Sequence, residues 1–454
     1  MDLFTYSILI LIVIILAARV IKRHSKILQK YFIPSSLIAG VIGLVLGPQL
    51  LGVIPEEVAA IWSTMPKNLI ILVFAGLFIG KYIPKAKKTR NLSSPMISFG
   101  MIIAWGHYVI GLLLAIFILT PIFGTNPLVA TLIEISFQGG HGTVAGLATT
   151  FEKLGWPEGV DIGYAIATLS IVVAVVGGIL SINLYNRKKK NNAGEKEYEK
   201  EYKKQEQAMI KSGYNLTRLR IKLEKYPEKL LVHILLFAFA IASGWLILKG
   251  LIFSENFVLG HFTDMRFFRY LPLFPLAMVG GLLVQLTLKR FKKENIVDTG
   301  LVHNICTIAL DFLVASALAT VSLNVIGKNY HVFLILSLAG ILWIALNFVF
   351  IAPLIFNKNW FVNGITNVGQ AMGVTATGLL LNRLSDPSNK TKAREIFGYK
   401  QLIFEMFMGG GIVTAISAVM VFQLGSTIAL IISSISLIFW IFIGIVLPRI
   451  RKRP

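Results

Sequence analysis

The chain has 454 residues, of which 55% are hydrophobic and only 15% are charged, and its mean hydropathy is +0.73. A soluble protein carries about 25% charged residues, so the composition excludes an ordinary soluble domain and favours a membrane protein. The formal net charge of +22 raises the question of a nucleic-acid partner. The single cysteine, Cys306, excludes a disulfide framework within the chain.

Apolar stretches of roughly 18 residues or more recur along the whole chain, as in polytopic helical membrane proteins. The first, FTYSILILIVIILAARVI, has no basic region before it and no small-residue cleavage site after it. It is therefore expected to be a retained span rather than a signal peptide. Eleven membrane spans are predicted, at 3–21, 31–47, 67–82, 96–120, 161–186, 230–252, 271–288, 300–325, 331–356, 400–423 and 426–448.

Two further segments, 127–150 and 361–383, are polar and rich in glycine. Each is long enough to enter the bilayer and turn back, the first from outside and the second from inside. If the first were instead a full span, the highly basic stretch after residue 186 would lie outside. The two segments are therefore predicted to be re-entrant hairpins of opposite orientation.

The basic residues gather on one side of the predicted membrane when the N-terminus is outside and the C-terminus is cytoplasmic. The cytoplasmic positions are Lys22–Lys30, Lys81–Arg90, Arg187–Lys229, Lys289–Lys293, Lys358, Arg383–Lys400 and the tail RIRKRP. This asymmetry follows the positive-inside rule for a multi-pass protein of the plasma membrane. It also explains the net charge through contact with anionic inner-leaflet lipid, without a nucleic-acid partner.

A charged linker, 187–229, divides the chain into a first repeat, 1–186, and a second repeat, 230–424. Each repeat contains four spans, a polar hairpin and a fifth span, and 425–454 adds a further span and a basic tail. Because five is an odd number, the halves must have opposite orientations, which is the inverted-topology repeat of many secondary transporters. The linker is expected to be a solvated tether with some helix, or else a regulatory module.

The stretch SFQGGHGTVAGLATT, 136–150, interrupts an apolar helix, and irregular backbone at membrane depth requires protein or a water-filled cavity around it. Gly139, Gly140 and Gly142 permit a reversal of the chain. The N–H groups of a helix that begins after the turn have no intrahelical partner and carry partial positive charge, which suits a carboxylate. The carbonyls of the preceding LVATLIEIS suit a hard cation such as sodium. The alternative is that these glycines only pack helices.

The second polar stretch, GITNVGQAMGVTATGLLLNR at 364–383, repeats this design from the other side. Gly369 and Gly373 permit a turn. The polar side chains beside it are Asn367, Gln370, Thr375 and Thr377. Half-helices that meet at the bilayer midplane can hold an anionic substrate and a cation together.

GGHGT at 139–143, followed by the Asp161-led span DIGYAIATLSIVVAVVGGI, closely resembles the sodium:glutamate symporter family of bacterial membranes. KNLIILVFAGLFIGKYI at 67–83 is similar to the third span of that family, and the resemblance covers most of residues 1–424. It implies a sodium-coupled carrier of glutamate or a similar anionic substrate. It further implies a homodimer, a transport domain that moves against a scaffold, and two hairpins that meet at the substrate site.

Carried over residue by residue, the family's site falls on GGHGT and on the glycine-x-threonine-x-threonine pattern at 373–377. Together with the neighbouring polar side chains, the predicted substrate-binding residues are Gln138, Gly139, Gly140, His141, Gly142, Thr143, Asn367, Gln370, Gly373, Thr375 and Thr377.

The second hairpin departs from the family pattern. Ala376 replaces the usual proline between the threonines, and polar residues around Thr366 and Asn367 stand where a His-Cys pair is expected. These positions lie where the protein would recognise its substrate. A sodium- or proton-coupled carrier of another carboxylate therefore remains the alternative.

Charged groups inside spans are costly and usually face a cavity or a partner. Asp311 lies well inside its span and is the leading candidate for a cation ligand, with a structural partnership as the alternative. Glu134 precedes the first hairpin tip and is either a cation ligand or a structural anchor. Ser136 completes the predicted ion-binding set.

Other ionisable residues have more ordinary explanations. His141 is expected to be structural or to contact substrate, and Asp161 to act as an N-cap-like group at the start of its span. Glu405 is expected to be a packing or interfacial residue, and Arg383 an interfacial anchor. No second histidine stands at metal-ligand spacing, so no metal besides sodium and no cofactor is expected.

Two other classes of protein compete with a carrier. An intramembrane enzyme would need a nucleophile with its base or a metal pair, but no GxSxG or HExxH motif occurs. An ion channel usually takes its selectivity residues from symmetric subunits. Inverted halves favour alternating access instead. The prediction is an all-α polytopic transporter with about eleven spans and two hairpins, which works by elevator-type sodium symport of a glutamate-like anion.

Overall fold

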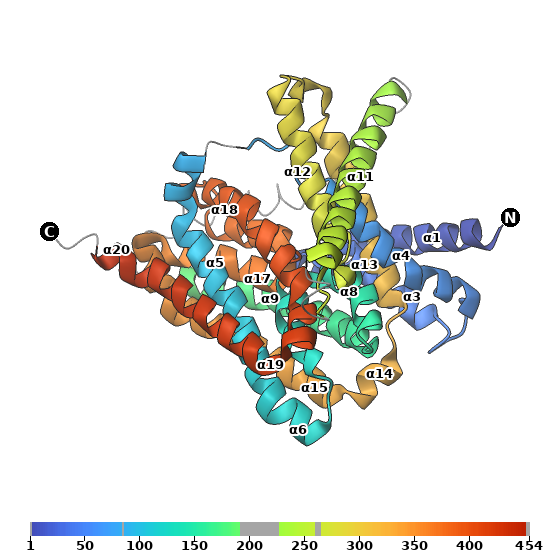
Figure 1. Cartoon of the computed structure of the whole chain (residues 1–454), viewed down its shortest axis with the longest axis horizontal. Helices are drawn as coiled ribbons and strands as arrows, with labels where there is room; N and C mark the ends of the chain where they lie inside the picture. Colours follow the sequence, from blue (N-terminus) through green and yellow to red (C-terminus); the bar gives the residue numbers. More distant parts are fainter. Residues whose placement is uncertain (1, 84–85, 191–226, 259–264, 451–454) are drawn as a thin grey trace.

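The computed structural model describes residues 2–83, 86–190, 227–258 and 265–450, so most of the predicted linker lies outside the described residues. Within these ranges every regular element is a helix (Figure 1). Eight helical segments of the described chain are long and apolar enough to cross a membrane. The predicted class, an all-helical polytopic membrane protein, is therefore confirmed.

The eleven predicted spans and the eight segments differ at three places. Helix α3, Ser35–Leu46, has 12 residues, and α12, Phe274–Arg290, has 17. The last two predicted spans, 400–423 and 426–448, fall in one helical run, Ala393–Ile450. The number of crossings and the side of each terminus remain predictions.

The first half contains four long helices and one broken segment. Its elements are α1 (Leu3–His24), α2 (Lys26–Lys30), α3, α4 (Glu56–Ala75), α5 (Ala86–Leu114), η1 (Ala115–Leu119), α6 (Thr120–Phe123), η2 (Pro127–Thr131), α7 (Leu132–Phe137), α8 (Gly140–Lys153) and α9 (Glu158–Lys190). The predicted span 67–82 is shifted, because α4 begins at Glu56 and ends at Ala75. Glu56 and Glu57 in its first turn favour that start through the helix dipole, a signal that apolarity alone does not give.

The second half contains the remaining helices. Its elements are α11 (Pro227–Val258), η5 (Phe268–Tyr270), α12, η6 (Glu294–Ile296), α13 (Thr299–Ala319), α14 (Leu323–Lys328), α15 (Tyr330–Leu346), η7 (Asn347–Ile351), α16 (Ala352–Phe356), η8 (Asn357–Asn359), α17 (Trp360–Ser385), α18 (Ala393–Phe407), α19 (Ile412–Ile441), η9 (Phe442–Val446) and α20 (Leu447–Ile450). Gly425, with φ of 80° and ψ of 159°, interrupts α19 between the two last predicted spans.

The predicted span 400–423 is not continuous. Helix α18 ends at Phe407 and α19 begins at Ile412, with three successive glycines between them. Gly409 and Gly410 have φ of 65° and 104°, a region that glycine enters without the steric cost of a Cβ. The same glycines lower helix propensity, so the helix breaks there although the flanking sequence is apolar.

The helices pack in two groups, which Figure 1 shows on the right and upper side and on the left and lower side. The frame helices are α1, α3, α4, α11, α12 and α13, and the core helices are α5, α7, α8, α9, α15, α17, α18 and α19. Within the frame the most extensive packing is of α13 on α3 and α4 and of α11 on α12; within the core it is of α9 on α17 and of α5 on α19. The two groups touch mainly where α8 packs on α4 and α13.

Small residues set the close packing of α11 on α12. A methyl group added at Gly280 would lie 2.0 Å from the carbonyl oxygen of Ala240, and one added at Gly244 would lie 2.5 Å from the backbone nitrogen of Ala277. Such close approach of backbones is the usual packing mode of membrane helices, which lack a hydrophobic driving force between them.

We expect Gly280→Ala to destabilise the protein by about 1–3 kcal/mol, because the added methyl group forces α12 away from the backbone of α11. Thermal unfolding of the purified protein in detergent should show a melting temperature several degrees lower. Gly177→Ala in α9 is the matched control, since no heavy atom lies within 4 Å of the added methyl group. Equal melting temperatures for the two variants would contradict the packing described.

Candidate functional site

The first polar segment is a pair of helices separated by a break. Helix α7 ends at Phe137 and α8 begins at Gly140, whose φ of 65° lies in the left-handed region. No side chain caps α8 at Gly139. The N–H groups of the first turn, Gly140–Thr143, therefore have no intrahelical partner and point out of the helix end. The break falls where the sequence predicts a turn.

The second polar segment turns back on itself. Helix α17 is interrupted at Gly373 (φ −150°, ψ 29°) and Val374 (φ 63°, ψ 173°), whereas Gly369 stays helical. The two arms of α17 lie side by side, because a methyl group at Gly369 would lie 3.0 Å from Cα of Gly378. Across the same arms the Asn382 amide donates to the Thr366 hydroxyl at 2.9 Å. The predicted turn at Gly373 is thus present. Gly369, which has no side chain, allows the two arms to approach closely.

The two breaks touch each other. A methyl group added at Gly140 would lie 3.0 Å from Cγ1 of Val374. Nε2 of Gln370 donates to Oε1 of Gln138 at 3.3 Å, and both side chains are buried. Segments more than 200 residues apart in sequence therefore meet at their non-helical residues.

A third break, Met408–Gly411 between α18 and α19, lies against the first. A methyl group at Gly409 would lie 3.2 Å from the carbonyl oxygen of Gln138, and one at Gly410 would lie 2.6 Å from Oγ1 of Thr143. This break was not predicted, although the run FEMFMGGG contains its signal in three consecutive glycines.

Glu134 joins the first break to the third. Its carboxylate, fully buried, accepts hydrogen bonds from the Tyr108 hydroxyl at 2.7 Å, the Gly409 N–H at 3.0 Å and the Thr414 hydroxyl at 2.9 Å. Three donors from α5, the third break and α19 thus surround one carboxylate. These contacts fit the role of structural anchor, one of the two roles that the sequence left open for Glu134. Its ion-binding role stays a prediction.

Several buried polar atoms beside the breaks have no hydrogen-bond partner within the described chain. They include Oγ of Ser136, Nε2 of Gln138 and Oδ1 of Asn367. Burying a polar atom without a partner is costly, so such atoms are rare in folded proteins. Hydroxyl and amide groups of this kind can contact an ion or a polar substrate.

His141 is held inside the core helices. Its Nε2 lies 2.9 Å from the Thr168 hydroxyl, and its ring stacks on Tyr164 with 6.0 Å between the centroids. Both partners belong to α9, so His141 fixes α8 to its neighbour. The contacts agree with the structural alternative proposed for this residue.

Thr375, just after the second break, takes part in a polar network with α18. Its hydroxyl donates to the Glu405 carboxylate at 2.5 Å and accepts from the Gln401 amide at 2.6 Å. Lys400 donates at 2.7 Å to the side-chain oxygens of both Gln370 and Gln401. Glu405, expected to be a packing or interfacial residue, thus contacts a predicted site residue, and Lys400, counted among the cytoplasmic basic residues, is buried among the core helices.

The loop that leads into α18 is fixed by Asp386. Its carboxylate accepts from the backbone N–H of Lys390 at 3.0 Å, and from the N–H and hydroxyl of Thr391 at 2.8 and 2.6 Å. Burial on its own would raise the pKa of Asp386, but these hydrogen bonds stabilise the charged form and leave the pKa below its ordinary value.

Asp311 and Asp161 lie apart from the breaks. Asp311 on α13 forms an ion pair of 2.9 Å with Arg19 on α1, so its partner is another frame helix. Asp161 accepts a hydrogen bond of 2.9 Å from the N–H of Ser322, the residue that caps α14. Neither contact reaches the residues of the three breaks.

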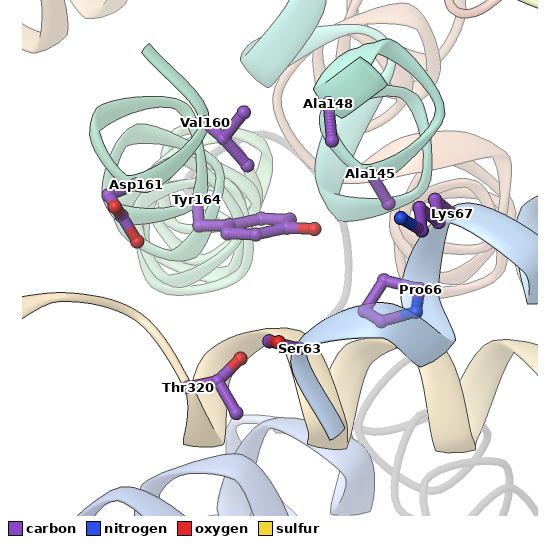
Figure 2. Close-up of a pocket in the computed structure, with 9 residues that line it drawn as sticks. All are labelled: Ser63, Pro66, Lys67, Ala145, Ala148, Val160, Asp161, Tyr164 and Thr320. Atoms are coloured by element: carbon purple, nitrogen blue, oxygen red, sulfur yellow. The ribbon is translucent and has the colours of Figure 1, made fainter. Parts of the chain in front are cut away.

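A cavity of about 220 Å³ lies where the frame meets the core. Figure 2 shows the Tyr164 hydroxyl directed across it toward Lys67 of α4, with Ala145 of α8 beside that lysine and Ala148 further along the same helix. Thr320, just after α13, lines the frame side. The cavity therefore separates α8 and α9 from the frame at the main contact between the two groups.

The described residues form a polytopic membrane protein in which broken helices from both halves meet at a buried polar centre, the arrangement found in secondary transporters. The family model of the sodium/glutamate symporter matches residues 1–382. This is most of the chain, so the protein belongs to the sodium/glutamate symporter family. The family is one of transporters that couple glutamate to sodium. No curated protein and no solved structure gave a match.

The Arg19–Asp311 pair allows a test of the two roles left open for Asp311. We expect Asp311→Asn and Arg19→Asp to lower the melting temperature, because each leaves a charge without its partner. The exchange Arg19→Asp with Asp311→Arg should restore most of the loss, and the sodium dependence of uptake should not change. A sodium dependence altered by Asp311→Asn with unchanged stability would instead support the ion-binding role.

Proposed function

We propose that this protein is a secondary active transporter of the plasma membrane that imports glutamate or a similar anionic amino acid together with sodium. The observation that supports it most is the contact of the two breaks, at Gly140 and Val374. Each break belongs to one half of a chain whose element order repeats. Two similar halves give a carrier two states of comparable energy, as alternating access requires.

The substrate carboxylate binds, in this proposal, between two helix N-termini. One is the first turn of α8, Gly140–Thr143, and the other is the second arm of α17, which begins at Thr375. Both ends present N–H groups and partial positive charge. The unpaired Nε2 of Gln138 at the first break and the unpaired Oδ1 of Asn367 on the first arm of α17 would contact polar groups of the substrate.

Sodium binds at the opposite helix ends. The last carbonyls of α7 precede the first break, and the Ser136 hydroxyl there has no partner in the described structure. Carbonyl and hydroxyl oxygens are ligands that a hard cation accepts. Because Glu134 lies one turn earlier, its negative charge favours a cation at this end.

Alternating access occurs by movement of the core helices against the frame helices, in an elevator-type mechanism. The limited contact of α8 with α4 and α13 supports this division, as does the cavity that separates them. The frame supplies the interface of a homodimer, and lipid covers the remaining apolar surface. The N-terminus lies outside and the C-terminus in the cytoplasm, as the distribution of basic residues indicates.

A carrier of another carboxylate is the second candidate. It is favoured by the departures from the family pattern at Thr366, Asn367 and Ala376, on the arms of α17. Asn367 is fully buried in the first arm of α17, before the second break. A changed side chain there would alter selection among carboxylates and leave the helix ends that bind the carboxylate unchanged.

Uptake of labelled glutamate into proteoliposomes tests the proposal. An inward sodium gradient should drive saturable accumulation, and Gly140→Val should reduce it more than 100-fold because valine is strained at φ of 65° and clashes with Val374. Gly155→Val is the matched control, since Gly155 has φ of 77° but no heavy atom near its added carbon.

The outcomes separate the two candidates. Absence of glutamate uptake, with sodium-dependent thermal stabilisation by another carboxylate, would favour the second candidate. Equal uptake with and without sodium would contradict sodium coupling. Full activity of Gly140→Val would contradict a site at the breaks.

The proposed movement predicts that a link between α4 and α8 stops transport. In a Cys306→Ala background, Ser63→Cys and Ala148→Cys place thiols on the two sides of the cavity. A short bis-maleimide should lower uptake at least tenfold in the double variant. The same reagent should leave each single-cysteine variant active. Undiminished uptake by the linked protein would show that α8 does not move against α4.

A further inference from the structure

Lys400 is a buried lysine at the centre of the core helices. Its side chain is fully buried on α18, and its Nζ donates at 2.7 Å to Oε1 of Gln370 and to Oε1 of Gln401. The ring centroids of Phe404 and Phe397 lie 3.6 and 5.5 Å from the same nitrogen. Two amide oxygens and two aromatic rings thus surround the ammonium group.

The opposite side of this cage is shaped for the lysine. A methyl group at Gly100 on α5 would lie 2.7 Å from Cε of Lys400 and 3.0 Å from Nζ. Any larger residue at position 100 would displace the ammonium group. Helices α5, α17 and α18 therefore enclose it together.

Both hydrogen bonds of Lys400 go to neutral amide oxygens. The carboxylate of Glu405 is linked to Lys400 only through the side chain of Gln401. Gln401 accepts from Lys400 and donates to the Glu405 carboxylate at 3.0 Å. Amide oxygens and aromatic ring faces are groups that can hold a cation away from water.

We propose that the Lys400 ammonium is a tethered cation that fills a cation site between the second break and α18, a position that free sodium would take in its absence. The ammonium fixes the Gln370 oxygen, so that the Gln370 amide faces Gln138 across the two breaks at 3.3 Å. A charge that belongs to the chain moves with the core helices and is not released. This consequence for transport rests on the function proposed above.

The test compares the melting temperatures of purified wild type, Lys400→Ala and Lys400→Ala/Glu405→Gln in detergent, as choline is replaced by sodium. Lys400→Ala leaves a hole with two amide oxygens and an uncompensated carboxylate. We expect it to melt several degrees below wild type in choline and to gain several degrees more than wild type from sodium. The double variant is the matched control. It lacks both the Lys400 side chain and the negative charge of Glu405. Sodium should therefore raise its melting temperature by the same amount as that of wild type.

Two results would overturn the proposal. One is a sodium gain in Lys400→Ala no larger than that of wild type. The other is a Lys400→Ala protein that is not folded at any sodium concentration, because an added ion then fails to replace the ammonium.

Uptake gives a second measurement. The sodium concentration for half-maximal uptake should rise at least fivefold in Lys400→Ala, with no such rise in Gly177→Ala. If the wild-type protein does not transport glutamate, the proposed function is wrong. The melting temperatures still test whether Lys400 acts as a tethered cation.

Discussion

The backbone of a broken helix inside a membrane needs partners, because no water reaches it there. This constraint governs the centre of the protein. The first break is covered by the second, at Gly140 and Val374, and the third break gives its Gly409 N–H to Glu134 beside the first. The breaks thus lie against one another, and the Glu134 carboxylate satisfies one backbone N–H group of the third break. A polar centre assembled in this way is also where unpaired helix ends become available to an ion or a substrate.

Two sets of charged side chains each lie within one of the two groups of helices. Arg19 and Asp311 are both on frame helices, whereas Lys400 and Glu405 are both on α18. Neither set of contacts would be separated by the movement of the core helices against the frame helices that is proposed above. The contact between the groups consists largely of α8 on α4 and α13, beside a cavity. An interface of this kind can slide with less loss of packing than the close α11–α12 contact inside the frame.

Local signals predicted much of this arrangement, and long-range contacts account for what was missed. Glycines beside polar residues placed the breaks at Gly140 and Gly373, since backbone freedom is a property of the residue itself. The burial of Lys400 could not be foreseen, because it depends on Gly100, 300 positions earlier in the chain. Counting charges therefore treated Lys400 as a cytoplasmic residue. The Arg19 partner of Asp311 was hidden for the same reason, since only the fold brings α1 to α13.

The two halves are alike in order but differ in the helix that follows the broken segment. In the first half α9 runs unbroken from Glu158 to Lys190, whereas in the second half glycines divide α18 from α19. The family match ends at residue 382, before α18 begins. The residues that meet Thr375 and Gln370 from α18 therefore lie outside the matched segment. Membership of the family indicates sodium-coupled transport of glutamate in general, and the contacts of α18 with Thr375 and Gln370 come in addition to the matched segment.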